Sequence, residues 1–223
     1  MKKKPEHMGV CVRCGTCCKK GGPGFHTEDK FLIETGIVPL KHLYTLRKGE
    51  MVWDNVRDRF LPTETDIIKM KSGKDFRTCF FFDGKENRCG IYKNRPFECR
   101  VLKCWDTRQT EEIYSKNRLS RKDLLSDVRG LWELLEDHQE RCDYEKIRCL
   151  VKNFEGKGKA DALSCLSDII GYDTHIRILL TEKGVASHDV TDFLFGRPLR
   201  QTIGMFGLKF ESRENRSWLR KIG

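Results

Sequence analysis

The segment CVRCGTCC, residues 11–18, decides what this chain folds around, because four of its eight residues are cysteine. A Cys-x-x-Cys turn brings two sulfurs onto one metal ion. Here the turn runs twice, so Cys11, Cys14 and Cys17 follow at equal steps. Three thiolates from one tight loop, with a fourth from a distant segment, are typical of four-iron clusters, whereas a mononuclear zinc site more often takes two ligands from each of two turns. The loop therefore predicts a metal site and favours an iron–sulfur cluster over zinc.

The adjacent pair Cys17 and Cys18 raises the question of whether the loop serves one site or two. In extended backbone, successive side chains point to opposite sides. We therefore expect one of the two sulfurs either to bind a second site or to lie next to the ligands of the first site without binding its metal. A loop that gives its last cysteine to a neighbouring cluster has a precedent in two-cluster ferredoxins.

The rest of the N-terminal half supplies the other candidate ligands. Eight of the 11 cysteines lie in the first 104 residues, which equals two sets of four. The candidate metal ligands are Cys11, Cys14, Cys17, Cys18, Cys79, Cys89, Cys99 and Cys104. The remaining three, Cys142, Cys149 and Cys165, fall in helical patterns without short pairings, and we expect them to pack in the core as small apolar residues.

The beginning of the chain bears on whether these cysteines form disulfides. The sequence MKKKPEHMGV has the positive residues of a secretory signal, but no apolar segment follows them. We therefore expect a cytoplasmic protein, in which metal binding or redox chemistry explains many cysteines better than a disulfide framework does. No apolar run approaches the roughly 20 residues that a membrane-spanning helix needs.

The 223 residues carry a formal net charge of +10, which by itself suggests nucleic acid or another acidic partner. That count treats every cysteine as a neutral thiol. Four thiolates around one zinc ion, or around one oxidised four-iron cluster, leave a net charge of about −2. Two such sites would lower the net charge to about +6, so metal binding weakens the argument for nucleic acid.

The sequence predicts an α+β fold, in which a small irregular cysteine-rich metal-binding unit with a short β-hairpin is covered by a mostly helical C-terminal half. In the first half, Thr27 is a candidate N-cap of a short helix that ends near Gly36, and Pro39 suits the start of a second helix. The segments TCFFF (78–82) and RCGIY (88–92), joined by DGKEN, predict the hairpin. Cys79 and Cys89 are expected on its two strands.

The second half shows the spacing of amphipathic helices. Leucine and valine recur at three- and four-residue steps over residues 121–139, where Ser120 and Asp123 form a capping pattern. Further helices are expected from Tyr144, around DTHIRILLTEKG up to Gly184, and in the two short segments VTDFLFG and RPLRQTIGMFG. We predict a cysteine-cluster metal-binding domain over residues 1–110 and a helical region packed on it over residues 111–223.

Three segments together, CVRCGTCC, CFFF and RCGIYKNRPFECR, resemble the CxxCxxCC domain, a zinc- or iron-chelating family whose members include the YkgJ-type cysteine-cluster proteins. The resemblance covers roughly residues 9–105. It implies metal chelation by the eight cysteines of the first half, in a bacterial, cytoplasmic protein. The flagellin lysine methyltransferases are similar in the cysteine motif, and in them the domain is linked to an iron–sulfur cluster and to methyl transfer.

Three functions stay open at this point, and whether the chain is an enzyme is among the questions they leave. The first is a metal-binding protein with a structural or redox role, holding an iron–sulfur cluster of the 4Fe-4S type or, alternatively, zinc. The second is a cluster-dependent protein-modifying enzyme such as a lysine methyltransferase, with an unknown protein as partner or substrate. Against it, the cysteines do not follow the Cys-x3-Cys-x2-Cys order of radical enzymes that use S-adenosylmethionine. The third is a zinc-stabilised nucleic-acid-binding module that would use RSWLRK and its Trp218, although a solvated helix end explains that segment better.

A few residues near the cysteines have two interpretations. His7 and His26 flank the loop and either bind a metal, support its ligands or lie exposed without a metal, and the exposed position is expected for both. Tyr92, Arg95 and Pro96 match a Tyr-x-x-Arg-Pro element of the family that the chain resembles. Arg95 and Arg100 either donate hydrogen bonds near thiolate sulfurs or stabilise a structural turn.

Overall fold

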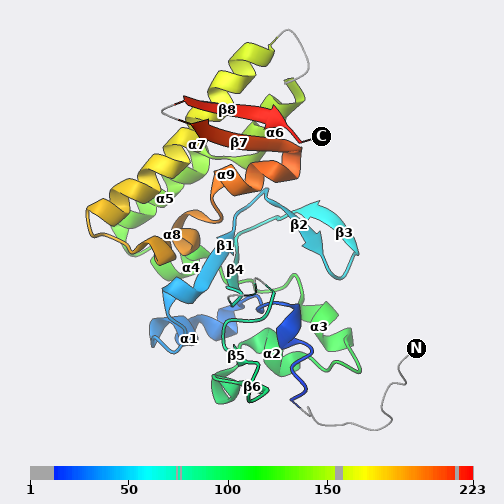
Figure 1. Ribbon diagram of the computed structural model, residues 1–223. Helices are drawn as coiled ribbons and strands as arrows, with labels where there is room; N and C mark the ends of the chain where they lie inside the picture. The colour runs from blue at the N-terminus through cyan, green and yellow to red at the C-terminus, as the bar shows by residue number, and fades with distance from the viewer. Residues whose placement is uncertain (1–12, 74, 76, 154–157, 214–215, 223) are drawn as a thin grey trace.

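The centre of the fold is a two-stranded antiparallel ribbon formed by β1 (Leu43–Leu46) and β4 (Ile67–Met70). The computed structural model describes residues 13–73, 75, 77–153, 158–213 and 216–222 (Figure 1). Because side chains alternate along a strand, one face of the ribbon carries Leu43, Thr45, Ile68 and Met70, all buried in the core. The other face carries the remaining four residues of the two strands. The ribbon thus separates the core from a second surface, which proves to be part of the candidate site.

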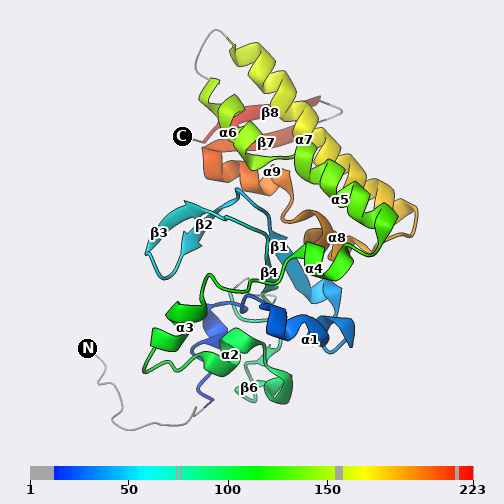
Figure 2. The ribbon, with the colours of Figure 1, turned by 180° about the vertical axis from the view of Figure 1, so that it is seen from behind.

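The part of the molecule on one side of this ribbon is built from short elements (Figures 1 and 2). Two further hairpins pair β2 (Met51–Asp54) with β3 (Arg59–Pro62) and β5 (Phe82–Asp83) with β6 (Arg88–Cys89). The short helices of this part are η1 (Cys18–Lys20), η2 (Thr27–Asp29), α1 (Lys30–Glu34), η3 (Leu40–His42), η4 (Tyr92–Asn94), α2 (Phe97–Val101) and α3 (Arg108–Ile113). The hairpin predicted between residues 78 and 92 is present, but its strands are only two residues long.

The prediction of a helix that starts at Pro39 is wrong beyond the first turn. Pro39 precedes η3, which ends at His42, and the chain then enters β1. The segment LYTL alternates between core and surface and contains an aromatic and a β-branched residue, which favours a strand. Leu40, Leu43 and Arg47 have the spacing of one helical face, but no such face forms, because pairing with β4 overrides the helical spacing.

The C-terminal half is mostly helical, as predicted. Its helices are α4 (Arg121–Leu125), α5 (Arg129–Arg141), α6 (Tyr144–Lys152), α7 (Lys159–Glu182), α8 (His188–Phe195), α9 (Leu199–Thr202) and η6 (Ile203–Phe206). The capping box of Ser120 and Asp123 is confirmed, although the predicted helix over residues 121–139 is divided into α4 and α5. Gly184, at φ 68°, follows the end of α7, where a left-handed residue closes many helices.

The sequence patterns did not predict the last two strands of the chain. β7 (Leu208–Arg213) pairs with β8 (Arg216–Lys221), and this hairpin packs beside α7 and α9 at the far end of the molecule from α2 (Figures 1 and 2). The basic segment around Trp218 is therefore a strand and not a helix end. Glu211 binds Lys209 and Arg220 on its surface, so part of its positive charge is neutralised.

Two groups of buried apolar residues hold the elements together. The larger group joins residues such as Phe25, Leu32 and Ile68 of the first half to Leu135 and Phe193 of the second. The smaller one lies among α6, α7, α9 and the final hairpin. The division at residue 110 stays a prediction, and the larger core spans it. None of the helices in the described ranges combines the length and the apolar character that a membrane crossing requires.

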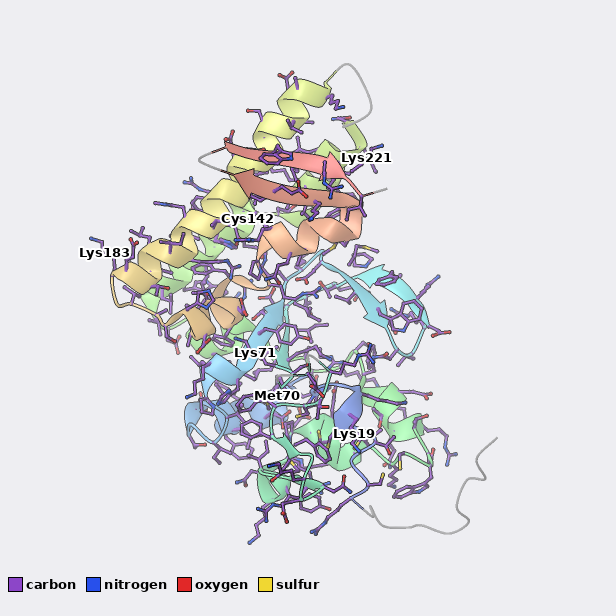
Figure 3. All side chains as sticks on the ribbon, viewed as in Figure 1. Lys19, Met70, Lys71, Cys142, Lys183 and Lys221 are labelled. Atoms are coloured by element: carbon purple, nitrogen blue, oxygen red, sulfur yellow. The ribbon has the colours of Figure 1, made fainter. Side chains whose placement is uncertain are left out.

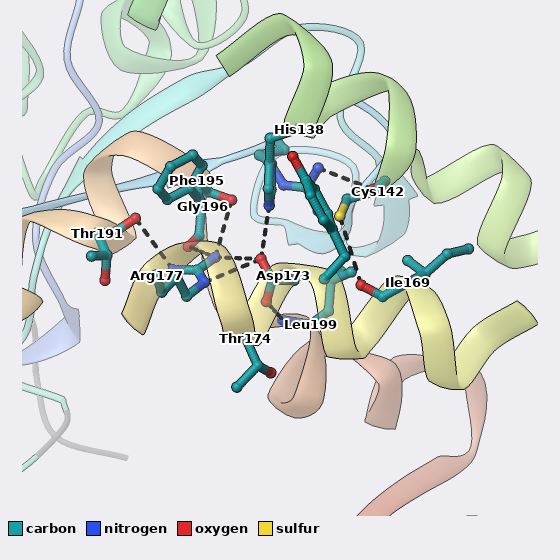
Figure 4. Close-up of polar contacts among 12 residues, drawn as sticks. His138, Cys142, Ile169, Asp173, Thr174, Arg177, Thr191, Phe195, Gly196 and Leu199 are labelled. Atoms are coloured by element: carbon teal, nitrogen blue, oxygen red, sulfur yellow. Dashed lines mark hydrogen bonds and ion pairs between the residues drawn. The ribbon is translucent and has the colours of Figure 1, made fainter. Parts of the chain in front are cut away.

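A buried polar network fixes the turn after α8 (Figure 4). Asp173 of α7 accepts hydrogen bonds from His138 Nε2 (2.8 Å), from Arg177 Nη2 (2.9 Å) and from the Leu199 backbone N–H (2.9 Å). Arg177 in turn donates to the carbonyl oxygens of Phe195 and Gly196. Carbonyl groups at a helix end lack partners within the helix, so the buried guanidinium supplies them.

This network predicts a loss of stability in mild acid. Burial lowers the pKa of His138 from 6.5 to about 4. Between these two pH values the imidazole ring binds a proton in the unfolded chain but not in the folded chain. The free energy of unfolding therefore decreases by about 3 kcal/mol as the pH falls from 6.5 to 4. Urea unfolding at pH 7 and pH 4.5 measures it. The His138→Gln variant should lose most of this pH dependence, whereas His175→Gln, at an exposed position of α7, should retain it.

Candidate metal centre

The structure brings together the candidate cysteines that it describes. Cys14, Cys17, Cys18, Cys79, Cys89, Cys99 and Cys104 all line one cavity of about 800 Å³. They come from the N-terminal loop, the β5–β6 region and the α2 region, which lie near one another below the central ribbon in Figure 1. Cys11, like His7, lies outside the described residues. The seven side chains therefore meet in space although up to 90 residues separate them in the sequence.

A tight turn at Gly15 shapes the N-terminal loop. Gly15 has φ 72°, and a Cβ atom there would lie 2.3 Å from the ring of Phe82. The left-handed backbone and the lack of space therefore both exclude a side chain at this position. The chain then turns into η1, and Lys19 N donates to Gly15 O over 2.9 Å. The loop is thus a helical turn wrapped closely against the β5–β6 hairpin.

The expectation that Cys17 and Cys18 point to opposite sides is wrong, because it assumed extended backbone. Cys17 is in the right-handed helical region, with φ −65° and ψ −41°. Neighbouring side chains diverge less there than in a strand, and the two Sγ atoms lie 4.0 Å apart. Both thiols therefore face the same cavity.

Backbone contacts tie the other cysteines to this loop. Cys79 N donates to Cys18 O over 2.8 Å, which fixes the two segments side by side. Cys79 forms an isolated bridge with Ser72 and does not lie on a strand of the hairpin, so that expectation is wrong, whereas Cys89 lies on β6 opposite Phe82, as expected.

Helix α2 presents Cys99, and a polar network next to it holds the helix in place. Glu98 accepts a hydrogen bond from the Gly24 backbone N–H (2.7 Å) and pairs with Arg118 and with His26, whose Nε2 lies 3.5 Å away. His26 is therefore buried, contrary to the expected exposed position. It stabilises the fold beside the cysteines, because its ring lies between α2 and the Lys116 carbonyl oxygen.

A second contact anchors the same helix. Asp29 accepts a hydrogen bond from the Phe97 backbone N–H over 2.7 Å and lies 3.6 Å from Arg100. Arg100 thus binds a buried carboxylate, which agrees with its structural interpretation. Arg95 stabilises a turn by donating to Tyr92 O, which agrees with its structural interpretation. Its charge favours the ionised forms of Cys17 and Cys89 and so acts to lower their pKa values.

The electrostatics of the cavity fit a cation-binding donor set. Burial raises the pKa of Cys79, Cys89 and Cys99, and the charges of neighbouring cysteines raise it further. The hydrogen bond from Cys18 lowers the pKa of Cys17 to about 6, while the pKa of Cys18 is raised well above its usual range. Several thiolates this close repel one another unless a metal cation compensates them.

The spacing of the sulfurs bears on the kind of metal group. Four thiolates around one zinc ion, at Zn–S distances near 2.3 Å, stand about 3.8 Å from one another. Within the described ranges, no three cysteines of the cavity have sulfurs within 4.8 Å of each other. In a four-iron cluster each thiolate binds a different iron, so the sulfurs stand further apart. The Cys17 and Cys18 sulfurs, 4.0 Å apart, have the spacing of two ligands of one ion, and no third described cysteine of the cavity has a sulfur within 4.8 Å of both.

The other cysteines lie away from this cavity. Figure 3 places Cys142 in the helical part of the molecule, far from Lys19 next to the cysteine loop. Cys142 is buried, as expected, but Cys149 and Cys165 are exposed, so the prediction of core packing is wrong for these two. Cys149 lies on α6 and Cys165 on α7, each at an exposed position. None of the ten described cysteines forms a disulfide in the structure.

Sequence reasoning missed the wall of the cavity opposite the cysteines. Tyr44, Leu46, Ile67 and Lys69, the second face of the central ribbon, all line it. Trp53 and Phe60 of the β2–β3 hairpin and Trp105 before α3 extend this wall with exposed rings. The alternation in LYTL and IIKM was the available signal, but the helical spacing around Pro39 obscured it.

The fold and the cavity together define a cysteine-rich metal-chelating domain. Comparison with known families agrees: residues 10–119 match the model of the CxxCxxCC family, which is described as "Putative zinc- or iron-chelating domain". Residues 10–119 therefore form a domain of this family. No curated protein and no solved structure matches the chain.

Proposed function

We propose that the protein holds an iron–sulfur cluster of the 4Fe-4S type in the cysteine-lined cavity, where it has a structural or redox role. The proposed ligands come from Cys11, Cys14, Cys17, Cys18, Cys79, Cys89, Cys99 and Cys104. The observation that carries the proposal is the convergence of the seven described members of this set on one cavity. The cluster, when bound, would supply one-electron redox chemistry and cross-link three segments of the chain.

The residues of the chain have distinct tasks in this proposal. The cysteines provide the thiolates, and Arg95 provides a positive charge near Cys17 and Cys89 that stabilises their ionised forms. Glu98 and Asp29 hold α2, and thereby Cys99, against the loop that follows the first cysteines. Hydrogen bonds and charges next to the ligands of a metal site orient these ligands and tune the bound group.

Absorption spectroscopy of anaerobically prepared protein tests the proposal. The expected result is a broad band near ~400 nm, the signature of thiolate-bound iron–sulfur centres. Partial bleaching on addition of dithionite would support a redox role, whereas a band that resists the reductant would support a structural one. A colourless protein that retains zinc after anaerobic preparation would contradict the iron–sulfur assignment.

One observation favours a second candidate function, a cluster-dependent protein-modifying enzyme. The cavity is larger than the cysteines require, and its aromatic wall leaves room for a bound molecule beside the metal. Calorimetry with S-adenosylmethionine and metal-loaded protein tests the methyl-transfer form of this idea. Saturable binding would support it, and the absence of heat would remove the methyl-donor step.

A further inference from the structure

The face of the central ribbon that lines the cavity carries polar groups without partners. Tyr44 and Lys69 stand opposite each other in the β1–β4 pair, so their side chains share this face. In the described part of the chain, no acceptor lies within hydrogen-bond distance of Lys69 Nζ, although Lys71, two residues on, binds both Asp189 O and Asp192. Thr110 of α3 lines the same cavity, and its buried Oγ1 also lacks a partner.

Within the described ranges no anionic group contacts the Lys69 ammonium group, although the charges of Glu98 and Cys99 act on it from a longer distance. Glu98 is the nearest carboxylate with an effect on Lys69, but it already binds Gly24 N, Arg118 and His26. Arg197, another cation of the cavity wall, is bound to Glu50 over 2.6 Å. Burial lowers the pKa of Lys69, as expected for a cation without a contacting anion. An anion bound in the cavity would satisfy it.

The remaining wall of this part of the cavity is aromatic. Trp53 and Phe60 meet edge to face at 5.1 Å, and both are largely exposed at the tip of the β2–β3 hairpin. Trp105 and Tyr114 face the cavity from either end of α3. Pockets with mostly apolar and aromatic walls and a few polar groups are typical of small-molecule sites.

From these observations we propose that the ribbon side of the cavity binds a small aromatic anion, whose acidic group contacts Lys69, Tyr44 and Thr110 and whose ring packs against Trp53, Phe60 and Trp105. The cavity of about 800 Å³ lies within the range of small-molecule sites, and the cysteines occupy only part of its wall. The site depends on the ribbon and the β2–β3 hairpin, so it stands whichever metal the cysteines hold.

Isothermal titration calorimetry of the metal-loaded full-length chain tests this site with three probes of similar shape: indole-3-propionate, its neutral amide, and the cation tryptamine. The acid should bind at least tenfold more tightly than the amide or tryptamine, because a charge-assisted hydrogen bond is worth about that factor. Equal binding of the acid and tryptamine, or no heat with any of the three probes, would overturn the proposal.

Variants of the wall assign the acidic group to its contacts. Lys69→Met, which keeps the length of the side chain, should weaken binding of the acid at least tenfold and leave binding of the amide unchanged. Tyr44→Phe, which removes one oxygen atom, should weaken it about threefold to tenfold. Lys122→Met, at an exposed position of α4, is the matched control. Metal content and circular dichroism verify each variant, and equal affinities of both ribbon variants and the control would refute the assignment.

Discussion

Replacing Cys99 by serine is expected to reduce the iron bound per chain to about one tenth of its normal value or less. Cys99 is presented by α2 toward the cavity, where the charges of Cys17, Cys79 and Cys89 act on it. A serine oxygen is a poor ligand for iron in a cluster that thiolates hold. Loss of one ligand also removes a link between α2 and the N-terminal loop. Iron analysis and the absorbance near ~400 nm of the anaerobically prepared variant measure the effect.

The same substitution at a cysteine outside the cavity provides the control. Cys165→Ser and Cys149→Ser change exposed thiols on α7 and α6. Both variants should retain the iron content and the absorbance of the unchanged protein. If Cys99→Ser retained full iron as well, Cys99 would not be a ligand, and the proposed set would have to be revised.

The substitution Asp173→Asn is expected to destabilise the helical half by about 3–5 kcal/mol, the usual cost of removing one partner of a buried ion pair. The carboxylate compensates Arg177 and accepts from His138, while its other oxygen binds the Leu199 N–H. An amide group leaves the buried guanidinium without its counter-charge and places N–H donors where two acceptor oxygens are required.

Thermal unfolding followed by circular dichroism measures this loss, which should lower the Tm by roughly 10 °C for a chain of this length. Asp168→Asn, one and a half turns earlier on α7 and exposed, should change the stability by no more than about 0.5 kcal/mol. The network would lack the stabilising role assigned to it if the two variants melted at the same temperature.

Local sequence patterns predicted the parts of the fold that local interactions decide. The helices of the second half follow from their apolar spacing, and the Ser120 capping box from its two residues. The central ribbon could not be predicted in this way, because β1 and β4 are four residues each and are separated by 20 residues that include another hairpin. Their pairing depends on contacts with α8 and with the core, which no short window of sequence contains.

The candidate site shows the same division. The dense spacing of CVRCGTCC and the Cys79–Cys104 region identified the cysteines that the structure gathers in one cavity. The expected divergence of the Cys17 and Cys18 side chains was wrong, since the local backbone is set by Gly15 and its packing against Phe82. Neither the burial of His26 nor the position of Lys69 can be read from spacing, because both result from segments that meet only in the folded chain.

The most direct test of the central claim is the quantification of iron, acid-labile sulfide and zinc in one anaerobically prepared sample of the full chain. An iron–sulfur cluster of the 4Fe-4S type predicts about four iron and about four sulfide per cluster, with zinc near background. Zinc at about two per chain, without iron or sulfide, would mean two four-thiolate zinc sites and would contradict the account.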